Sequence, residues 1–209
     1  MDKKAYIEQI EKNVKNCQKC RLYKLAKNAV PGEGSIDTEL VFVGEAPGAT
    51  EDATGRPFVG RAGMLLEALL KKIGYERKDV WIGNIIKHRP PENRDPLPDE
   101  LAACEGYLTL QLKTIKPKLV VTLGRFSMNY FYEEGKITRD HGQLINVGEY
   151  FVYPVYHPAA ALRNPTMAKV LTEDFMKIPS ILNDVKLKLV KGANTMPVPS
   201  NDGQTALGF

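Results

Sequence analysis

Apolar and polar residues alternate along the chain in two distinct patterns. Short apolar runs that end in Gly, Pro or a polar residue predict buried strands, at 39–44, 80–87, 118–124 and 150–156, the last after a hairpin that begins near residue 143. Apolar residues spaced three or four positions apart predict helices, at 3–15, 61–73, 98–116, 125–133 and 165–185. Because strands and helices alternate, we expect an α/β fold with helices on both faces of a parallel sheet.

Length and composition fit one folded unit with a tail. The chain has 209 residues, of which 43% are hydrophobic and 26% charged, as in ordinary globular proteins. We expect one domain over 1–185 and a flexible tail over 186–209, where the sequence turns polar and rich in Pro and Gly. No apolar run is long enough for a membrane span and the first residues are charged, so we expect a soluble cytoplasmic protein without a membrane partner. The net charge of +4 is compatible with a polyanionic partner, but a charge of this size does not distinguish nucleic-acid-binding proteins from others.

Polar residues mark the ends of three of the predicted strands. Gly44 and Glu45 follow the first strand, Asn84 lies near the end of the second, and His157 follows the fourth. Ligands of parallel α/β sheets bind at the carboxyl ends of the strands. The sequence therefore predicts a binding site that these residues share.

The segment GEAPGATEDATGRPFVGRAG at 44–63 is the richest in candidate chemistry. Its glycines and prolines allow the backbone to approach a ligand closely. It also carries two candidate carboxylates, Glu45 and Glu51, and an aromatic residue, Phe58. The plainer interpretation is that the carboxylates face solvent and that Phe58 plugs the core.

Three cysteines and a histidine form a candidate metal site. Cys17 and Cys20 are a Cys-x-x-Cys pair, Cys104 lies on the helix predicted at 98–116, and His88 ends the second strand. An odd cysteine count argues against a disulfide framework. Three thiolates and an imidazole suit a structural zinc ion or a 4Fe–4S cluster equally well, and a redox dithiol fits less because the pair does not follow a strand. The alternative for Cys104 is a small core residue on an apolar helix face.

The segment at 44–63 resembles motif one of the iron–sulfur uracil-DNA glycosylases of family four. The match continues with NIIKHRPPENRDPLPDELAAC at 84–104 and HPAAALRNP at 157–165, and it covers about residues 10–185. The resemblance implies a three-layer α/β/α sandwich with a central four-stranded parallel sheet. It implies an enzyme of base excision repair that flips uracil out of DNA and hydrolyses its N-glycosidic bond. It also implies a structural 4Fe–4S cluster held by Cys17, Cys20, His88 and Cys104.

The chain departs from the family pattern at one position. His88 stands where the family usually has Cys, whereas the related cross-linking glycosylases have His there. Those relatives capture uracil-DNA covalently through a His in a basic insertion, which gives an alternative function. The corresponding loop here, RPPENRDPL at 89–97, is short and contains no His. Hydrolytic excision is therefore the expected activity.

The resemblance also assigns site residues. Phe58 would stack on the flipped uracil, Asn84 would read its edge, and Gly44 and Ala46 would line the base pocket. His157 would donate to uracil O2. Glu45, or alternatively Glu51, would orient the attacking water. For DNA contacts, Leu162 is the candidate wedge in the gap left by the flipped base, and Arg163 and Arg56 are candidate phosphate contacts. The plainer interpretation is that the loop at 157–165 only caps a helix.

The C-terminal residues QTALGF resemble a motif that docks on the sliding clamp. Gln204, Leu207 and Phe209 are the residues that carry this resemblance. The alternative is a chance pattern at a disordered end, because short motifs match by accident. We otherwise expect a monomer whose partner is uracil-containing DNA.

Overall fold

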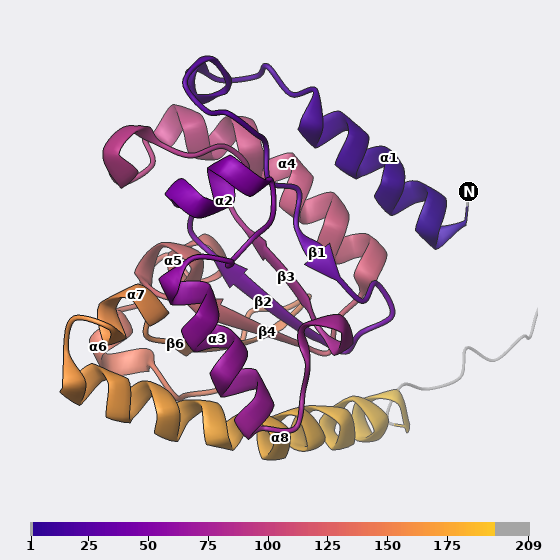
Figure 1. Cartoon of the computed structure of the whole chain (residues 1–209). Coiled ribbons are helices and arrows are strands. Elements are labelled where there is room, and N and C mark those ends of the chain that lie inside the picture. The colour runs from indigo at the N-terminus through magenta and orange to yellow at the C-terminus, as the bar shows by residue number, and fades with distance from the viewer. Residues whose placement is uncertain (1, 195–209) are drawn as a thin grey trace, which may run out of the picture.

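A mixed sheet of six strands forms the centre of the protein in a computed structural model that describes residues 2–194 (Figure 1). The strand order is β1-β3-β2-β4-β6-β5. The inner four strands, β3, β2, β4 and β6, are all parallel, which confirms the predicted parallel sheet. Two short antiparallel edge strands, β1 and β5, extend it beyond the four strands expected. The bounds are Glu33–Gly34 for β1, Leu40–Gly44 for β2, Trp81–Asn84 for β3, Leu119–Leu123 for β4, Ile145–Asn146 for β5 and Phe151–Val155 for β6.

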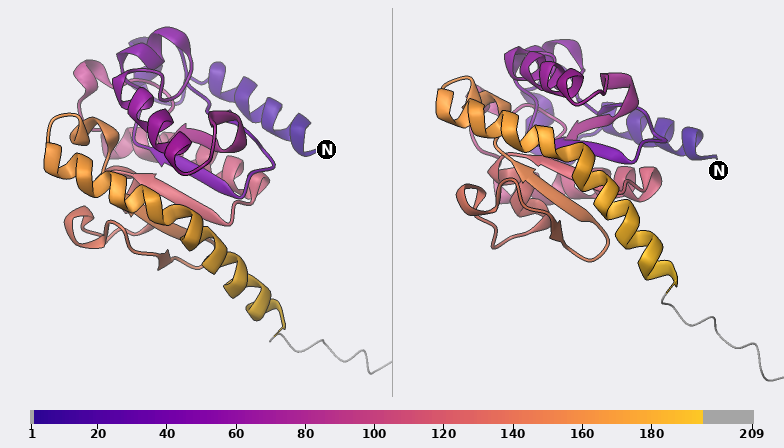
Figure 2. Two further views of the ribbon diagram at one scale, coloured as in Figure 1. Left: turned by 60° about the horizontal axis from the view of Figure 1, so that its bottom comes forward. Right: turned by 90° about the horizontal axis from the view of Figure 1, so that it is seen from below.

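Helices cover both faces of this sheet, so the predicted three-layer arrangement is confirmed (Figures 1 and 2). One face packs against α3 (Arg61–Lys72), α7 (Pro158–Ala161) and α8 (Pro165–Asn194), where Leu66, Leu70 and Phe175 meet Phe42 and Val121. The other face packs against α1 (Lys3–Lys15), α4 (Pro98–Ile115) and α5 (Arg125–Phe131), where Val14 and Leu108 meet Val41, Trp81 and Val120. The two short helices α2 (Ala49–Thr54) and α6 (Ile137–Asp140) complete the set.

The last helix is longer than the sequence pattern predicted. Helix α8 runs to Asn194, so residues 186–194, expected to begin the flexible tail, are helical. Up to residue 190, the last buried residues of α8 are Leu182 and Val185. The following KLKLVK continues the helix because Lys and Leu favour it. The candidate clamp motif at 204–209 lies outside the described residues. Within residues 2–194, no helix combines the length and the apolar character that a membrane crossing requires.

The chain changes direction across the sheet beside β2. From β2 it passes to β3 on one side, and then to β4 and β6 on the other. In open parallel sheets, such a switch point leaves a crevice at the carboxyl ends of the strands, where ligands bind. The fold therefore places the residues that follow β2 at the centre of the expected site.

Candidate active site

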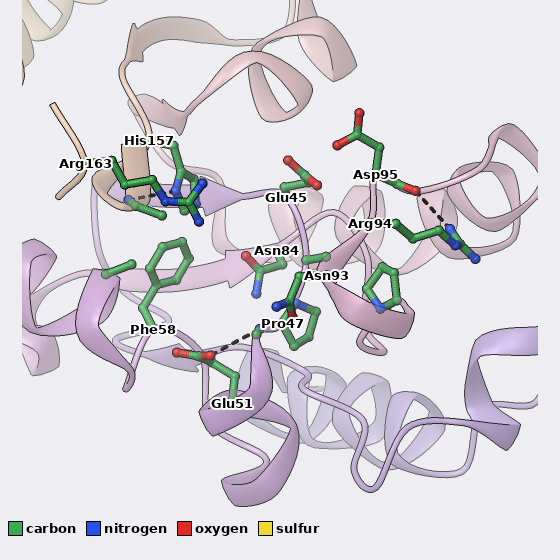
Figure 3. Close-up of a pocket in the computed structure, with 15 residues that line it drawn as sticks. Glu45, Pro47, Glu51, Phe58, Asn84, Asn93, Arg94, Asp95, His157 and Arg163 are labelled. Carbon is green, nitrogen blue, oxygen red and sulfur yellow. Dashed lines mark hydrogen bonds between the residues drawn. The ribbon is translucent and has the colours of Figure 1, made fainter. Parts of the chain in front are cut away.

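A cavity of about 340 Å³ opens at the carboxyl ends of the parallel strands (Figure 3). Glu45 follows β2, Asn84 ends β3 and His157 follows β6, and all three line this cavity. Their convergence was predicted from the strand ends alone, and the structure confirms it. Phe58, Glu51, Ala46 and Arg163 also line the cavity.

Phe58 forms one wall of the cavity in an unusual backbone conformation. Its side chain is buried, and its ring centroid lies 5.9 Å from that of His157. Its φ angle is 50°, a left-handed value that is uncommon for a bulky residue. Gly44 lies beneath the ring, where an added Cβ would come within 2.4 Å of Phe58 Cζ and 2.5 Å of Asn84 Oδ1. Glycine at 44 thus allows both side chains to reach the cavity.

Asn84 brings an unused hydrogen-bond acceptor to the cavity. Its side chain is buried, and Oδ1 has no hydrogen-bond partner among the described residues. The main-chain carbonyl oxygen of Asn84, by contrast, accepts a hydrogen bond of 2.8 Å from Lys87 Nζ. The fully buried Lys87 also donates to Gln111 Oε1 at 2.8 Å, so the end of β3 is held from behind. A buried acceptor without a partner is costly unless a ligand supplies the donor.

His157 is held as a neutral imidazole with its proton on the outer nitrogen. The residue caps α7, and its Nδ1 accepts a hydrogen bond of 3.1 Å from the Ala159 N–H. Because Nδ1 is an acceptor, the ring proton lies on Nε2. Burial lowers the pKa of His157 to about 4, against a smaller opposing effect of Glu51. At neutral pH the residue can therefore donate a hydrogen bond from Nε2 but carries no charge.

The two candidate carboxylates are held very differently. Both oxygens of Glu51 are occupied: Oε1 accepts from the N–H groups of Val59 and Gly60 at 2.9 and 2.8 Å, and Oε2 accepts from Gly48 N–H at 3.1 Å. No hydrogen bond joins the Glu45 carboxylate to the other residues that line the cavity (Figure 3). Burial raises the pKa of Glu45 to about 7, with a contribution from Asp95 and an opposing one from Arg125. Glu45 is thus free to bind and release a proton near neutral pH.

The loop between β3 and α4 forms a wall that sequence reasoning did not assign to the site. Pro90, Asn93, Arg94 and Asp95 all line the cavity. Arg94 forms a bidentate ion pair with the fully buried Glu100, at 2.8 and 2.6 Å, which fixes the loop to α4. The sequence does contain a signal for them, because these residues belong to the motif at 84–104.

The predicted DNA contacts are spread over two regions. Arg163 lines the cavity, and Leu162 beside it is 43% exposed. Arg56 lies outside the residues that line the cavity and forms hydrogen bonds of 2.8 and 3.1 Å with Glu33. Arg163 and Leu162 are therefore placed beside the cavity mouth, whereas the charge of Arg56 is already paired.

The candidate metal ligands lie outside the cavity lining, with Cys20 and Cys104 in one apolar cluster and Cys17 and His88 in a separate hollow. Cys104 packs with Leu22 and Ile86, and both Cys20 and Ala46 pack against this cluster. Cys17 and His88 line a separate hollow of about 700 Å³. Burial raises the pKa of Cys104, against the lowering effect of Lys87, whose N–H points at the sulfur and whose charge lies nearby. His88 is buried, and its Nδ1 has no hydrogen-bond partner within residues 2–194.

These ligands do not surround a point where one ion would sit. Across the described part of the chain, no three His, Cys, Asp or Glu side chains are grouped closely enough to bind a single metal ion. A tetrahedral zinc ion would need all four ligands within about 2.3 Å of it. The three thiols are free, with no disulfide among them.

Comparison with known proteins gives one consistent family. Residues 31–179 match the Uracil DNA glycosylase superfamily. A type-4 uracil-DNA glycosylase of Saccharolobus solfataricus is 47% identical over 194 residues, which cover 88% of this chain and 89% of that protein. Type-4 uracil-DNA glycosylases of Sulfurisphaera tokodaii and Thermotoga maritima are 49% and 44% identical, and the matches cover 82% and 84% of this chain and 83% and 94% of those proteins.

Proposed function

The chain belongs to the uracil DNA glycosylase superfamily, and from this premise we propose how its cavity removes uracil from DNA. The enzyme is a uracil-DNA glycosylase, a hydrolase that cleaves the N-glycosidic bond of uracil in DNA repair. A base stacked in a duplex is out of reach of such a cavity, so the nucleotide must be extruded into it. The single observation that carries the assignment of the site is the buried Asn84 amide, whose Oδ1 faces the cavity without a partner.

Asn84 explains how the cavity distinguishes uracil from cytosine. Uracil presents an N3–H donor and an O4 acceptor on this edge, whereas cytosine presents an N3 acceptor and an N4 donor. An amide with Oδ1 toward N3 and Nδ2 toward the exocyclic group pairs with uracil and leaves two mismatched contacts with cytosine. Phe58 supplies the aromatic surface on which the base stacks, with Gly44 leaving room beneath its ring.

His157 and Glu45 act on opposite ends of the bond that breaks. As the bond breaks, negative charge develops on uracil O2 and positive charge on the sugar. The neutral His157 donates its Nε2–H to O2 and stabilises that charge without transferring a full proton. Glu45 in its ionised form orients or deprotonates the attacking water and offsets the charge on the sugar. Glu51 holds the backbone of the Phe58 loop instead, because both of its oxygens are already bonded.

The residues beside the cavity are suited to contact the DNA strand around the extruded nucleotide. Arg163 can contact a phosphate beside the extruded nucleotide, and the exposed Leu162 can fill the gap that the base leaves. The pairing of Arg56 with Glu33 makes Arg56 the weaker candidate for a phosphate contact.

Cys17, Cys20, His88 and Cys104 are suited to hold the 4Fe–4S cluster that the type-4 relationship implies. Three free thiols and an imidazole are ligands that iron–sulfur clusters use. The unpartnered Nδ1 of His88 is available as a ligand atom. When bound, the cluster would tie 17–20, His88 and α4 together and would take no part in hydrolysis.

The clamp-binding motif at Gln204, Leu207 and Phe209 remains a separate proposal. Its sequence pattern is its only support. Binding of a synthetic 204–209 peptide to a sliding clamp, against a peptide with Phe209→Ala, would test it.

The test of the site is excision by Asn84→Ala beside a matched control. Thr122→Val serves as the control because Thr122, in β4 of the same sheet, also has a buried, unpartnered oxygen but lies outside the cavity lining. We expect Asn84→Ala to lower the rate of strand breaks at uracil, after alkali treatment, by about 100-fold or more, and Thr122→Val to match wild type. Equal rates for wild type and Asn84→Ala would refute the proposed site.

A further inference from the structure

Phe58 needs an outside constraint to keep its ring against the cavity. A left-handed bulky residue persists only where its surroundings hold it. One constraint is the close packing of α3 against the Phe58 backbone: a Cβ added to Gly63 would come within 1.8 Å of Phe58 O. The Glu51 contacts to Val59 and Gly60 hold the chain that follows. A third constraint acts on the main-chain carbonyl oxygens of Pro57 and Phe58, which both accept hydrogen bonds from one side chain.

The donor is Arg77, from the short 3-10 turn Arg77–Asp79 that precedes β3. Its Nη1 donates to Phe58 O at 2.9 Å and its Nη2 donates to Pro57 O at 2.7 Å. The same guanidinium is paired with Glu33 of β1 through Nε and Nη2. Four of the five N–H donors of Arg77 are thus used inside the protein.

Arg77 is poorly placed to bind DNA itself. Its side chain is 16% exposed, and its guanidinium is ion-paired with Glu33. Arg56, which shares Glu33, is 61% exposed and donates to neither Pro57 O nor Phe58 O. The guanidinium of Arg77 therefore holds the Pro57–Phe58 backbone and is not available at the surface for a phosphate contact.

We propose that Arg77, oriented by Glu33, is a positioning residue that fixes the left-handed Phe58 and so aligns the stacking surface for uracil. The proposal rests on the proposed function, because it gives Phe58 that surface. It concerns geometry rather than charge: a lysine has one ammonium and cannot donate to two adjacent carbonyls and a carboxylate in a fixed plane. Arg77 would act on uracil only through Phe58.

A double-mutant cycle separates this proposal from a general loss of stability. Arg77→Met and Arg77→Lys are compared with wild type, and Arg77→Met is repeated in a Phe58→Ala background. Lys78→Met is the matched control, because it removes the same charge from the neighbouring residue, which is 76% exposed and pairs with Glu76. Uracil excision (kcat/KM) and thermal melting are measured for each protein.

The expected pattern is specific. Phe58→Ala lowers kcat/KM, and Arg77→Met lowers it by about 10- to 100-fold, because small misplacements near the reacting groups have effects of this size. Arg77→Lys loses nearly as much although it keeps the charge. In the Phe58→Ala background, Arg77→Met changes kcat/KM by less than about twofold, the limit of ordinary additivity. Lys78→Met matches wild type.

Two results would overturn the proposal and leave the proposed function standing. One is wild-type activity in Arg77→Lys, which would show that charge alone matters. The other is an equal loss from Arg77→Met with and without Phe58, which would show that Arg77 does not act through it. Should Arg77→Met fail to fold, Arg77→Lys in both backgrounds carries the same test. Full activity in Phe58→Ala would instead refute the stacking surface of the proposed function, and the proposal with it.

Discussion

Replacement of Glu45 by Gln should abolish catalysis and stabilise the protein at the same time. Gln keeps the shape of the side chain but cannot ionise, so it cannot activate water. Burial raises the pKa of Glu45 from 4.5 to about 7, which means that the folded protein disfavours the charged form. The same property that places a base near neutral pH therefore weakens the fold.

The sign and size of both effects follow from that pKa. Below pH 4.5 the carboxyl is protonated in the folded and unfolded chains, so wild type and Glu45→Gln should have similar unfolding free energies. As the pH rises to about 7, the unfolded chain releases the proton first, and wild type loses stability. Since one pKa unit corresponds to about 1.4 kcal/mol, Glu45→Gln should be more stable than wild type by at most about 3.5 kcal/mol at pH 8, and by less because solvent screens the partly exposed carboxyl. Loss of the base should lower kcat/KM by about 100-fold or more.

The assay pairs melting curves with uracil excision at pH 5, 6, 7 and 8. We expect the difference in melting temperature between Glu45→Gln and wild type to grow with pH and then level off above about 7. Wild-type kcat/KM should fall about tenfold per pH unit below pH 7, with no added step from His157 above about pH 5. Equal stability of the two proteins at pH 8, or a wild-type rate that does not change between pH 5 and 8, would refute the reasoning.

Three other substitutions probe the supports of the site. Gly44→Ala places a Cβ 2.4 Å from Phe58 Cζ and 2.5 Å from Asn84 Oδ1, so excision should fall by about 100-fold or more; wild-type activity in an oligonucleotide assay would show that the cavity floor is not tight. Lys87→Met removes the donors to Asn84 O and Gln111 Oε1 and should lower the unfolding free energy by about 2 kcal/mol in denaturant titrations; an unchanged midpoint would contradict this. His88→Ala should lose iron and visible absorbance while His88→Cys keeps them, measured as iron per chain; full iron in His88→Ala would exclude His88 as a ligand.

The apolar pattern predicted the parallel core well and the edges poorly. The four inner strands and the main helices have buried faces, and burial imposes the periodicity on which the prediction rests. The edge strands β1 and β5 are two residues each and bury little, so no pattern marks them. The sequence ATEDAT of helix α2 predicts a polar loop. In the structure it is helical, with Gly48 as its N-cap and Gly55, at a φ of 72°, as its C-cap.

The site was predictable where it depends on strand ends and hidden where it depends on long-range contacts. Glu45, Asn84 and His157 converge because parallel strands end at one edge of the sheet, whatever their side chains do. The roles of Arg77 and Lys87 cannot be predicted from the sequence, because their partners include backbone carbonyls such as Phe58 O and Asn84 O, which no sequence pattern marks. The hydrogen bonds from backbone N–H groups to Glu51, which distinguish it from Glu45, likewise arise only in the folded chain.

The most direct test of the account measures what leaves the cavity. Purified, iron-loaded protein is incubated with an oligonucleotide carrying one labelled uracil, and free uracil, alkali-labile sites and heat-stable protein–DNA adducts are counted together. The account predicts one free uracil for each alkali-labile site, no adduct, and loss of both products in His157→Ala. An adduct that survives denaturation without release of uracil would contradict hydrolytic excision and favour covalent capture of DNA.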